Sequence, residues 1–584
     1  MSKMTRKEIS LVLEELVMLL ELTGENPFKI KAYRKGAEIV QSFEGNIVER
    51  ALDHDLEGIP GLGKGLQAAL YELVSTGELK LHQTLKGQYP ESLFDLFELQ
   101  GLGVKKIKAL HDTLEVSSID ELKAACESGR VSELSGFGKK TVENILQAIS
   151  SRQQYAGYHR YMSIAGVAQL FLERLQEHPE VHQSTICGSF RRGKEVSHDL
   201  DFLVATGKPG DLTKFFTTFP EVERVIACGE TKASVILQGK GLQCDLRAVS
   251  NAQFPFAQQY FTGSKEHNVA VRSKAKKYGL SLNEYGFTRI DETNEPLPEV
   301  HTEADLYRGL GLDFIEPELR ENRGEIEMAE TGALPKLVEL TNLRGTFHNH
   351  TTASDGRHTL REMADEADAL GLQYLGIADH SKSSFQANGL SEERLLAQIA
   401  DIRELNEQFA NEGRKFRVFA GSEVDILKSG ALDYDDELLK QLDYTVISVH
   451  QPLNMSEDQM TARLIKAMES PYATMLGHVT GRLLLRRDPY PVNLEKVIDC
   501  AAETGTIIEL NCSSMRADMD WRWWRLAQSK GVKTSINPDA HSIEGLQNLA
   551  FGVKLARKGG LTKGDVINCL SLDEINNALQ VKRP

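Results

Sequence analysis

The pattern of hydrophobic and polar positions divides the chain into a helical first part and a longer part that mixes helices with strands. Residues 9–22 predict an amphipathic helix, because Glu14 and Glu15 interrupt an apolar run. Between about residues 155 and 255, strand-like runs occur among helical ones. From residue 343 onward, apolar strands alternate with amphipathic helices, which is typical of a parallel α/β unit or barrel. The pattern therefore predicts a multidomain chain.

Three short segments of the helical part share one pattern. In each, an apolar residue stands between two glycines. A lysine and an amphipathic run come after the second glycine. Their residues are Gly61, Gly63 and Lys64; Gly101, Gly103 and Lys105; and Gly136, Gly138 and Lys139. Glycines permit a tight turn, and backbone N–H groups at the start of the next helix can face a phosphate. The repeats resemble the helix-hairpin-helix, which grips the DNA backbone without reading sequence. A plain turn between two helices is the alternative for any single copy.

A block of polar residues precedes a strand that carries two acids. The block reads G-S-F-R-R-G, and the strand opens with D-L-D. Asp199 and Asp201 are two positions apart, so both carboxylates lie on one face of the strand. Upstream, Gly188, Ser189 and Arg192 offer a backbone N–H, a hydroxyl and a guanidinium to an anion. An anion site beside two acids indicates nucleotidyl transfer.

A third acid, Asp245, stands in a second apolar segment that reads as a neighbouring strand. Carboxylate oxygens select Mg²⁺ or Mn²⁺ over softer metals. Two such ions held by three aspartates can activate an attacking hydroxyl and stabilise the leaving pyrophosphate. A lone D-x-D pair is often a solvated strand end, so the preceding block and the third acid carry this interpretation.

These motifs resemble those of the family X DNA polymerases, of which DNA polymerase beta is the best-known animal member. The resemblance implies that Asp199 and Asp201 bind both metals, that Asp245 binds one of them, and that Ser189 and Arg192 hold the triphosphate. It further implies a nucleotide pocket made by Tyr260, Phe261, Gly263, Asn268 and Arg272. Tyr260 and Phe261 would line the sugar, Asn268 would reach the base edge, and Arg272 would contact the minor groove. The chain departs from the animal enzymes at Gln243, where they carry an arginine, and this departure bears on how Asp245 is oriented.

In the C-terminal part, side chains of the metal-ligand type follow successive predicted strands. The nine candidates are His348, His350, Asp355, His380, Glu423, His450, His478, Asp539 and His541. Residues at the C-terminal ends of parallel strands converge on one mouth of a barrel. A single histidine at a strand end is more often structural, but nine such residues are hard to explain in that way. Imidazole with carboxylate suits Zn²⁺, Mn²⁺ or Fe²⁺, and a metal-bound water ionises near neutral pH, so the site could cleave a phosphoester.

This second constellation resembles the PHP (polymerase and histidinol phosphatase) domain, a distorted (β/α)7-type barrel with up to three ions, Mn²⁺ and/or Zn²⁺. The ligand sets implied by the resemblance are His348, His350, Glu423 and Asp539; Glu423, His450 and His478; and Asp355, His380 and His541. Some polymerase-linked PHP domains have lost ligands, so the complete set favours activity.

Together the two resemblances imply the arrangement of the bacterial and archaeal family X polymerases over nearly the whole chain. The expected parts are a helical DNA-binding domain at 1–85, a helix-hairpin-helix subdomain that holds the duplex at 86–154, an α+β nucleotidyltransferase palm at 155–255, a nucleotide-selecting thumb at 256–315, a partly helical linker at 316–340 and a PHP domain at 341–584. We expect the first domain to bind the downstream strand at a gap. The position of the family's Schiff-base lysine holds Ala69 here, which argues against lyase activity.

The function that these features predict is DNA synthesis from dNTPs across short gaps in base excision repair, combined with 3′–5′ exonuclease or 3′-end processing. One alternative is a template-independent nucleotidyltransferase fused to a small-molecule phosphoesterase of the histidinol-phosphatase kind. The hairpin repeats and the pair Asn268 and Arg272 argue against it. The other alternative is a non-catalytic scaffold that binds DNA ends, which the complete set of acids and histidines argues against.

Composition and charge refine this picture. The 584 residues are 41% hydrophobic and 26% charged, as in an ordinary globular protein. A net charge of −16 should repel DNA, but residues 1–300 hold 36 basic and 40 acidic side chains, against 32 and 44 in the remainder. Seven cysteines without C-x-x-C spacing, no 18-residue apolar run and no signal-peptide pattern predict a reduced, cytoplasmic protein. We expect a monomer.

Two further features of the C-terminal part concern aromatic and basic residues. The run W-R-W-W-R at 521–525 could stack on unpaired bases, but three tryptophans at helical spacing more often pack a barrel exterior against a neighbouring domain, which we expect here. Arg482, Arg486 and Arg487 follow His478 and are the candidates for steering a DNA strand toward the metals.

Overall fold

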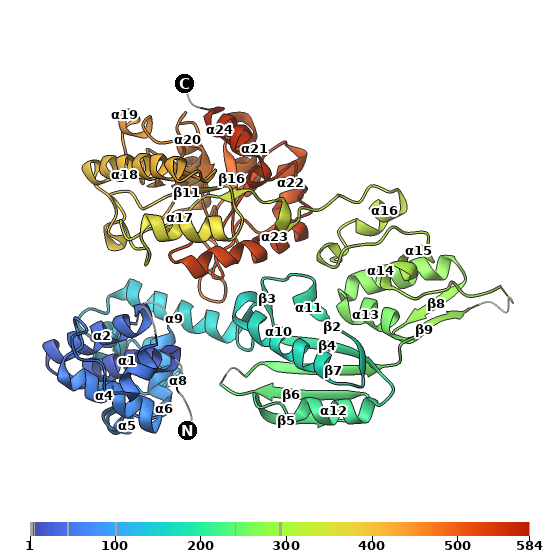
Figure 1. Cartoon of the computed structure of the whole chain (residues 1–584), viewed down its shortest axis with the longest axis horizontal. Helices are drawn as coiled ribbons and strands as arrows, with labels where there is room; N and C mark the ends of the chain where they lie inside the picture. The colour runs from blue at the N-terminus through green and yellow to red at the C-terminus, as the bar shows by residue number, and fades with distance from the viewer. Residues whose placement is uncertain are drawn as a thin grey trace. The chain divides into compact units, whose positions relative to one another are not determined.

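The computed structural model describes residue 4 and residues 6–43, 46–99, 102–239, 241–290 and 295–582. The chain forms two compact units, residues 1–156 and 157–584, and each is described by itself (Figure 1). Of the predicted site residues, Gly101 lies outside the described ranges. Among the described helices, none is long and apolar enough to cross a bilayer.

All the described elements of the first unit are helices. Its helices are α1 (Arg6–Thr23), α2 (Pro27–Ser42), α3 (Ile47–Leu52), α4 (Lys64–Thr76), α5 (Lys80–Lys86), α6 (Glu91–Phe94), η1 (Asp95–Glu98), α7 (Val104–Leu114), α8 (Ile119–Glu127), η2 (Arg130–Glu133) and α9 (Lys139–Gln154). One hydrophobic cluster is built chiefly by α1 to α4, and a second is built by α6 to α9 with Leu22 from the end of α1. The unit therefore has two small cores rather than one.

The three glycine-containing turns share one backbone geometry in the described residues. The amide of the apolar residue donates to a carbonyl three positions earlier in each copy, from Leu62, Leu102 and Phe137. The second glycine then accepts the first hydrogen bonds of the following helix, as Gly63, Gly103 and Gly138 do for α4, α7 and α9. Gly61 and Gly136 have φ of 90° and 86°, a left-handed conformation that favours glycine. The predicted repeat is therefore a real structural repeat.

The second unit begins with a five-stranded sheet covered by helices. Its elements are β1 (His159–Arg160), α10 (Tyr161–Glu177), β2 (Val181–Ile186), α11 (Gly188–Arg191), β3 (Val196–Ser197), β4 (Asp199–Thr206), α12 (Pro209–Thr217), β5 (Val222–Cys228), β6 (Lys232–Leu237) and β7 (Gln243–Val249). The strand order is β2-β4-β7-β6-β5, and only β4 and β7 pair in parallel. Leu200, Phe202 and Val204 of β4 face the core beneath α10 and α12. The alternate residues of β4 face the opposite side, where Asp199 and Asp201 lie.

A smaller helical and two-stranded region follows the sheet. It contains α13 (Phe254–Thr262), α14 (Lys265–Lys277), β8 (Leu280–Asn283), β9 (Gly286–Arg289), α15 (Glu303–Arg308), η3 (Pro317–Leu319) and α16 (Glu325–Glu330). One cluster of buried apolar residues runs from Phe256 to Leu337. The segment 316–340, predicted to be a partly helical linker, contains η3 and α16, and its residues Ile326 and Leu337 join this cluster.

The remaining residues form a ring of parallel strands with helices outside. The elements are η4 (Leu340–Asn342), β10 (Gly345–Thr346), α17 (Leu360–Ala369), β11 (Tyr374–Ile377), η5 (Phe385–Ala387), α18 (Glu392–Asn411), β12 (Arg417–Ala420), β13 (Glu423–Asp425), α19 (Asp436–Leu439), β14 (Val446–Ser448), α20 (Glu457–Met468), β15 (Met475–Leu476), α21 (Leu494–Thr504), β16 (Ile507–Asn511), η6 (Trp521–Trp523), α22 (Trp524–Ser529), β17 (Thr534–Asn537), η7 (Ile543–Gln547), α23 (Asn548–Lys558), η8 (Ile567–Cys569) and α24 (Leu572–Gln580). One sheet runs β10-β11-β12 and another runs β13 to β17 in order. Parallel bridges His380–Glu423 and Asn349–Ala540 join them at both ends. The predicted barrel of parallel α/β units is confirmed.

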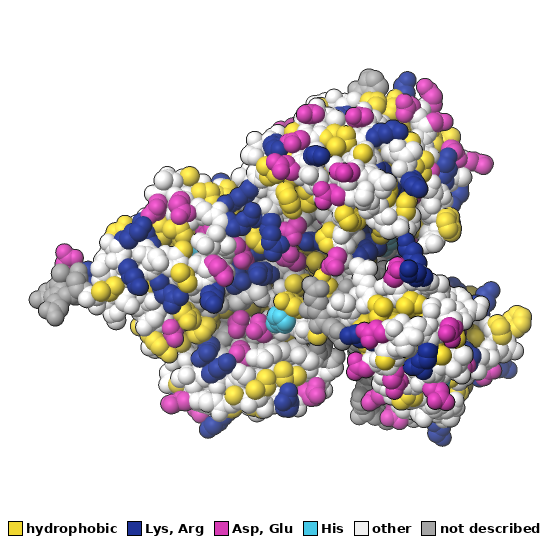
Figure 2. Space-filling view, turned by 180° about the vertical axis from the view of Figure 1, so that it is seen from behind, with side chains coloured by type: hydrophobic (Ala, Val, Ile, Leu, Met, Phe, Trp, Pro, Cys, Tyr) yellow, Lys and Arg dark blue, Asp and Glu magenta, His cyan; other side chains and the backbone are white. Residues whose placement is uncertain are grey.

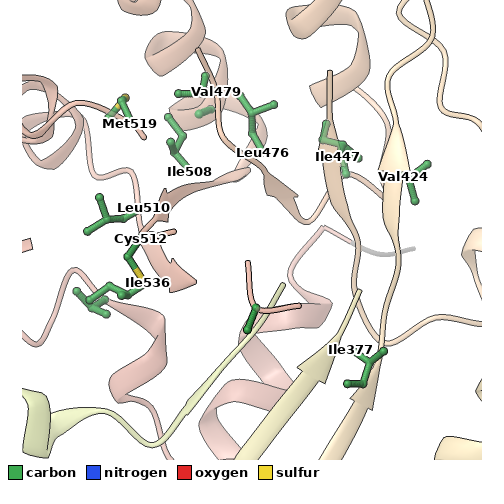
Figure 3. Packing of buried hydrophobic residues seen from close by; sticks show 14 of the residues in the cluster. Ile377, Val424, Ile447, Leu476, Val479, Ile508, Leu510, Cys512, Met519 and Ile536 are labelled. Atoms are coloured by element: carbon green, nitrogen blue, oxygen red, sulfur yellow. The ribbon is translucent and has the colours of Figure 1, made fainter. Parts of the chain in front are cut away.

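Side-chain alternation separates the barrel into two apolar layers. Outward-facing residues of successive strands, among them Val424, Ile447 and Ile508, pack beneath the surrounding helices (Figure 3). Their neighbours along the strands form a second cluster, in which the ring of Phe347 lies 4.9 Å from that of Tyr444. This aromatic cluster fills the barrel below the strand ends. Polar side chains on the same face of the strands therefore gather above it.

The tryptophan run packs against protein, as expected. Trp524 is fully buried and Trp521 is 6% exposed. The guanidinium of Arg323, from the segment before the barrel, lies 5.3 Å from the centre of the Trp521 ring. These rings are therefore part of the core and of its contact with the preceding segment.

We predict that W524A lowers the free energy of unfolding by about 3–5 kcal/mol, the usual cost of emptying a buried aromatic site. W523A is the matched control, because Trp523 is only half-buried and should cost less than half as much. Thermal unfolding of the two variants measures the difference. Equal losses would contradict the burial that separates them.

Candidate functional site

The three predicted aspartates of the palm meet at one end of the parallel strand pair. In the register of β4 and β7, Asp199 lies beside Gln243 and Asp201 lies beside Asp245. The carboxylates therefore come from adjacent strands on the same face of the sheet, away from the apolar core. The sequence predicted all three acids, and the register shows that Asp245 lies beside Asp201.

The electrostatics of this group favour a bound cation. Burial raises the pKa of Asp201, and the neighbouring carboxylates of Asp199 and Asp245 raise it further, to about 7. Burial and the charge of Asp245 also raise the pKa of Asp199. Three acids in a half-buried site repel one another unless a positive charge lies between them. Oxygen donors of this kind fit Mg²⁺ or Mn²⁺.

Two side chains orient Asp245. Lys232 Nζ, from β6, lies 2.8 Å from Asp245 Oδ2, and Gln243 Nε2 donates to Asp245 Oδ1 at 2.9 Å. Burial alone would raise the pKa of Asp245, but the hydrogen bonds from Lys232, Gln243 and Ser234 hold it below its ordinary value. Gln243, the departure noted in the sequence, thus holds the carboxylate in place. Lys232 was not predicted, because only the pairing of β6 with β7 brings it near the acids.

The G-S-F-R-R-G block forms a tight turn against these acids. Gly188 has φ of 62°, and a Cβ there would lie 2.1 Å from Asp201 Oδ2, so both backbone conformation and space favour glycine. Ser189 Oγ lies 2.7 Å from Ser197 Oγ. Arg192 is 8% exposed; it donates to the carbonyl of Thr262 at 2.5 Å and pairs with Glu321 Oε1 at 3.1 Å. The block is therefore tied both to the acids and to the end of α13.

The predicted nucleotide pocket lies on α13 and α14. The rings of Tyr260 and Phe261 lie 5.2 Å apart, edge to face. Asn268 is 8% exposed; its amide receives a hydrogen bond from Gln259 and donates to the carbonyl of Tyr260 at 2.7 Å. Arg272 donates to the carbonyl of Asn268 at 3.2 Å. Gly263, at φ of 68°, lies against Arg192, which joins this segment to the turn.

All nine predicted ligands of the barrel gather at its mouth. They form four overlapping groups whose ligand atoms lie within 4.8 Å of one another: His350, Asp355, His380 and His541; His348, His350 and Asp539; His348, Glu423 and His478; and His380, Glu423 and His450. Glu423 is central, since His478 Nε2 lies 2.8 Å and His450 Nε2 3.3 Å from its Oε1. The grouping shares Glu423, His348, His350 and His380 between neighbours, so it differs in part from the three sets expected from the resemblance.

The donor atoms of this group fit metal ions. His348 Nε2 and His350 Nδ1 are buried and have no hydrogen-bond partner among the residues that the structure describes, although such groups are nearly always paired. Burial lowers the pKa of His350, and the neighbouring imidazoles of His541 and His380 lower it further, to about 4. A neutral imidazole has a lone pair to offer a cation. Imidazole and carboxylate together suit Zn²⁺ or Mn²⁺.

Backbone strain also marks this mouth. His348, His478 and Asp539 have φ of 57°, 21° and 52°, in a region that side chains with a Cβ rarely adopt. Each such conformation costs about 1–3 kcal/mol and is common where function requires it. The surrounding fold therefore holds the backbone of these three predicted ligands in conformations that are locally unfavourable.

Comparison with known proteins establishes the family. The chain is 36% identical over 578 residues to the DNA polymerase/3′–5′ exonuclease PolX of Bacillus subtilis (strain 168), and the match covers 99% of this chain and 100% of that protein. The chain belongs to the PolX family. Parts of it also match four family descriptions: "Helix-hairpin-helix domain" at 4–79, "SAM-like Helix-hairpin-helix tandem" at 94–151, "DNA polymerase beta thumb" at 257–321 and "PHP domain" at 346–513.

Two further similarities are more distant. The chain is also similar to a probable phosphatase of Thermoanaerobacter sp. (strain X514), with 29% identity over 232 residues, 38% of this chain and 88% of that protein. A structure of Leishmania infantum polymerase beta in a ternary complex aligns with 40% of this chain and 98% of its own length, at 22% identity and a TM-score of 0.26. The family assignment rests on the full-length relative.

Two carboxylates that the sequence did not single out orient ligands of the PolX barrel. Glu509 Oε1 lies 2.5 Å from His348 Nδ1, and Asp425 Oδ1 lies 2.6 Å from His450 Nδ1. In both rings the other nitrogen faces Glu423 at 3.3 Å. A carboxylate behind a ligating imidazole fixes its tautomer and raises its basicity. Glu509 could have been noticed in the sequence, because it is an acid inside the mainly apolar strand 507–511.

Of the arginines expected to steer DNA toward this mouth, Arg482 has a structural role instead. It is 9% exposed, pairs with Asp520 at 2.7 Å and donates to the carbonyl of Arg516 at 3.0 Å. Arg487 donates to the carbonyl of Gly481, whereas Arg486 is exposed.

Asp379, also at a strand end, accepts hydrogen bonds from the Thr351 amide and hydroxyl and fixes a loop.

We predict that E509Q and D425N each weaken metal retention at the barrel mouth by about 10- to 100-fold. The reason is that E509Q removes the charge that orients His348, and D425N removes the charge that orients His450. Metal content after dialysis against a graded chelator series measures this. E437Q, which removes an exposed carboxylate of the same domain, is the control. Retention equal to the parent in both variants would show that the two acids do not support the ligands.

Proposed function

We propose that this PolX-family chain fills short gaps in DNA from dNTPs and trims 3′ ends before extension, as a step of DNA repair. Its family supports a DNA polymerase with 3′–5′ exonuclease activity, and each activity would have its own site in the second unit. The observation that carries the proposal is that both ligand sets are complete and converge. The three palm aspartates share one face of β4 and β7, and the nine barrel ligands share one mouth.

In the palm, Asp199, Asp201 and Asp245 would hold two Mg²⁺ or Mn²⁺ ions, which supply charge to the attacking 3′-hydroxyl and the leaving pyrophosphate. Ser189 and the backbone N–H groups of the turn that begins at Gly188, which lies against Asp201, would bind the triphosphate, with Arg192 as its guanidinium partner. Lys232 would keep Asp245 ionised and oriented. These roles follow from the family resemblance and from the placement of the residues.

The nucleotide would lie against α13 and α14. Tyr260 and Phe261 would line the sugar, and the turn at Gly263 would let the chain approach it closely. Asn268 and Arg272 would reach the base edge and the minor groove. The Asn268 amide already bonds to Gln259 and Tyr260, so that role requires it to exchange one of these bonds on binding.

At the barrel mouth, the nine ligands would hold up to three Mn²⁺ or Zn²⁺ ions, which lower the pKa of a bound water and polarise a phosphoester. Glu423 would be shared between ions, since three histidines lie within 3.3 Å of its Oε1. Glu509 and Asp425 would hold His348 and His450 in the ligating tautomer. The exposed Arg486 remains a candidate contact for the DNA strand.

DNA binding would come mainly from the first unit. Its hairpin turns present the N-terminal ends of α4, α7 and α9, and Lys105 and Lys139 beside two of them are exposed. In the second unit, basic and acidic side chains are interspersed over the face that Figure 2 shows, so the acidic excess does not form one repulsive surface there. We do not propose lyase activity, because Ala69 has no amine and is buried in the cluster built chiefly by α1 to α4.

A second candidate function is a small-molecule phosphoesterase at the barrel, which the similarity to the probable phosphatase favours. A gapped duplex and a free phosphomonoester, supplied in parallel, distinguish the two. Release of inorganic phosphate without shortening of the 3′ end would favour the second candidate.

We predict that H348A abolishes 3′ degradation and spares synthesis, while the double variant D199A/D201A abolishes synthesis and spares degradation. The reason is that the two ligand sets share no residue. Primer extension and 3′ degradation on one gapped duplex, with Mg²⁺ and then Mn²⁺, measure both. Loss of both activities in either variant would contradict the two-site proposal.

We also predict that K105A/K139A weakens binding of gapped duplex and lowers the slope of log affinity against log salt by about two, close to one for each phosphate that a lysine no longer neutralises. Fluorescence anisotropy over a salt series measures the slope. K80A, which removes an exposed lysine away from the hairpins, is the control. A slope unchanged in the double variant would show that the hairpins do not bind phosphates.

A further inference from the structure

One face of helix α23, on the outside of the PHP barrel, lies against the G-S-F-R-R-G turn of the palm. Its residues Phe551, Lys554 and Lys558 recur at i, i+3 and i+7, so they share one side of the helix. A Cβ at Gly193 of the turn would lie 2.7 Å from Lys554 Cγ, which shows how closely the two elements approach. Because Gly193 has φ of 66°, both backbone conformation and space favour glycine there. The turn that would bind the triphosphate is thus part of an interface with the barrel.

An aromatic stack reinforces this contact. Tyr161, at the start of α10, lies between Phe190 of the turn and Phe551 of α23. Its ring lies 4.2 Å from the first and 4.9 Å from the second, at 6° and 12° between planes. Three stacked rings fix the distance between the turn and the helix. The position of α23 therefore affects the position of the turn.

Lys558 contacts the turn directly. Its Nζ donates to the carbonyl of Arg192 at 3.0 Å and lies 2.6 Å from Glu321 Oε1, and it lies 4.6 Å from the centre of the Trp521 ring. The side chain is fully buried. Arg192 pairs with the same oxygen, Glu321 Oε1, at 3.1 Å. One carboxylate oxygen is therefore shared by a cation of the barrel and a cation of the palm.

We propose that Lys558 is a positioning residue for nucleotide binding, because it shares Glu321 with Arg192 and so leaves the Arg192 guanidinium available to the triphosphate. This inference rests on the proposed role of Arg192. Without Lys558, the whole charge of Glu321 falls on Arg192 in a site where water does not screen it, and the guanidinium is held away from the incoming phosphates. The loss of the bond to the Arg192 carbonyl also loosens the turn. The PHP barrel would then support nucleotide affinity in the polymerase site without contacting the nucleotide.

The test is steady-state primer extension by the full-length chain on a gapped duplex with Mn²⁺, at varied dNTP. We expect K558M to raise the KM for dNTP about tenfold, the size of one charge-assisted hydrogen bond, and to leave kcat within twofold. Degradation of 3′ ends should be unchanged. K530M is the matched control, because Lys530 forms an ion pair with Asp499 elsewhere on the barrel and should leave both constants unchanged.

Three further variants separate positioning from structure. K558R keeps the cation and should return the KM to within about threefold of the parent. E321Q removes the competitor for Arg192 and should not raise the KM, and K558M/E321Q should restore most of what K558M loses. A double variant no better than K558M, or an E321Q chain whose KM rises tenfold, would overturn the proposal. Melting temperatures identify a variant that fails to fold. If K558M fails to fold, E321Q carries the test, because glutamine is nearly isosteric with glutamate. A tenfold rise in the KM of E321Q for dNTP would then overturn the proposal.

R192A separates this inference from the function on which it rests. If R192A leaves the KM for dNTP unchanged, the proposed role of Arg192 is wrong. If R192A raises the KM and K558M does not, only the coupling between α23 and the turn is wrong.

Discussion

The alternation of side chains along a β-strand is the constraint on which both sites depend. In β4, Leu200 and Phe202 enter the core, and this leaves Asp199 and Asp201 together on the other face. In β16, Ile508 and Leu510 pack outward, so Glu509 and Asn511 point inward above the aromatic cluster. The hydrophobic effect thus determines where the ionisable groups must lie. Packing brings the carboxylates close together, so they repel one another. A bound cation would relieve that repulsion.

Neighbouring side chains orient several of the predicted ligands in these crowded sites. Lys232 and Gln243 fix Asp245 in the palm, while Glu509 and Asp425 fix His348 and His450 in the barrel. Glu509 is itself held by the amides of Asn511 and Asn537 and by the backbone N–H of His478. Asp245, His348 and His450 are therefore oriented by protein groups before any ion binds. The strained backbone at His348, His478 and Asp539 is tolerated for the same reason, since the surrounding bonds determine it.

How much could be predicted from the sequence depended on how local each signal was. The hairpin turns and the strand-end ligands follow from spacing, since the residue types repeat at fixed places relative to predicted elements. Lys232 could not be found in this way, because it meets Asp245 only through the pairing of β6 with β7. Arg482 was misread for a related reason: a basic residue near a ligand looks exposed in sequence, whereas Asp520 and two carbonyls bury it. The segment 316–340 reads as a linker from its composition, yet the ionic partners of Glu318 and Glu321 lie more than two hundred positions away.

The contact between palm and barrel is held by charges that cannot easily be exposed separately. Lys558 is buried against the Trp521 ring, and burial lowers its pKa to about 8 despite the pairing with Glu321. Removing any one of Lys558, Glu321 and Arg192 would leave a buried charge without its partner, which typically costs about 3–5 kcal/mol. A purely apolar contact could slide, because dispersion does not specify register, but a shared carboxylate oxygen admits one arrangement. The same bonds that hold α23 against the G-S-F-R-R-G turn therefore also set the geometry of that turn, so the packing of the barrel and the position of the turn are not independent.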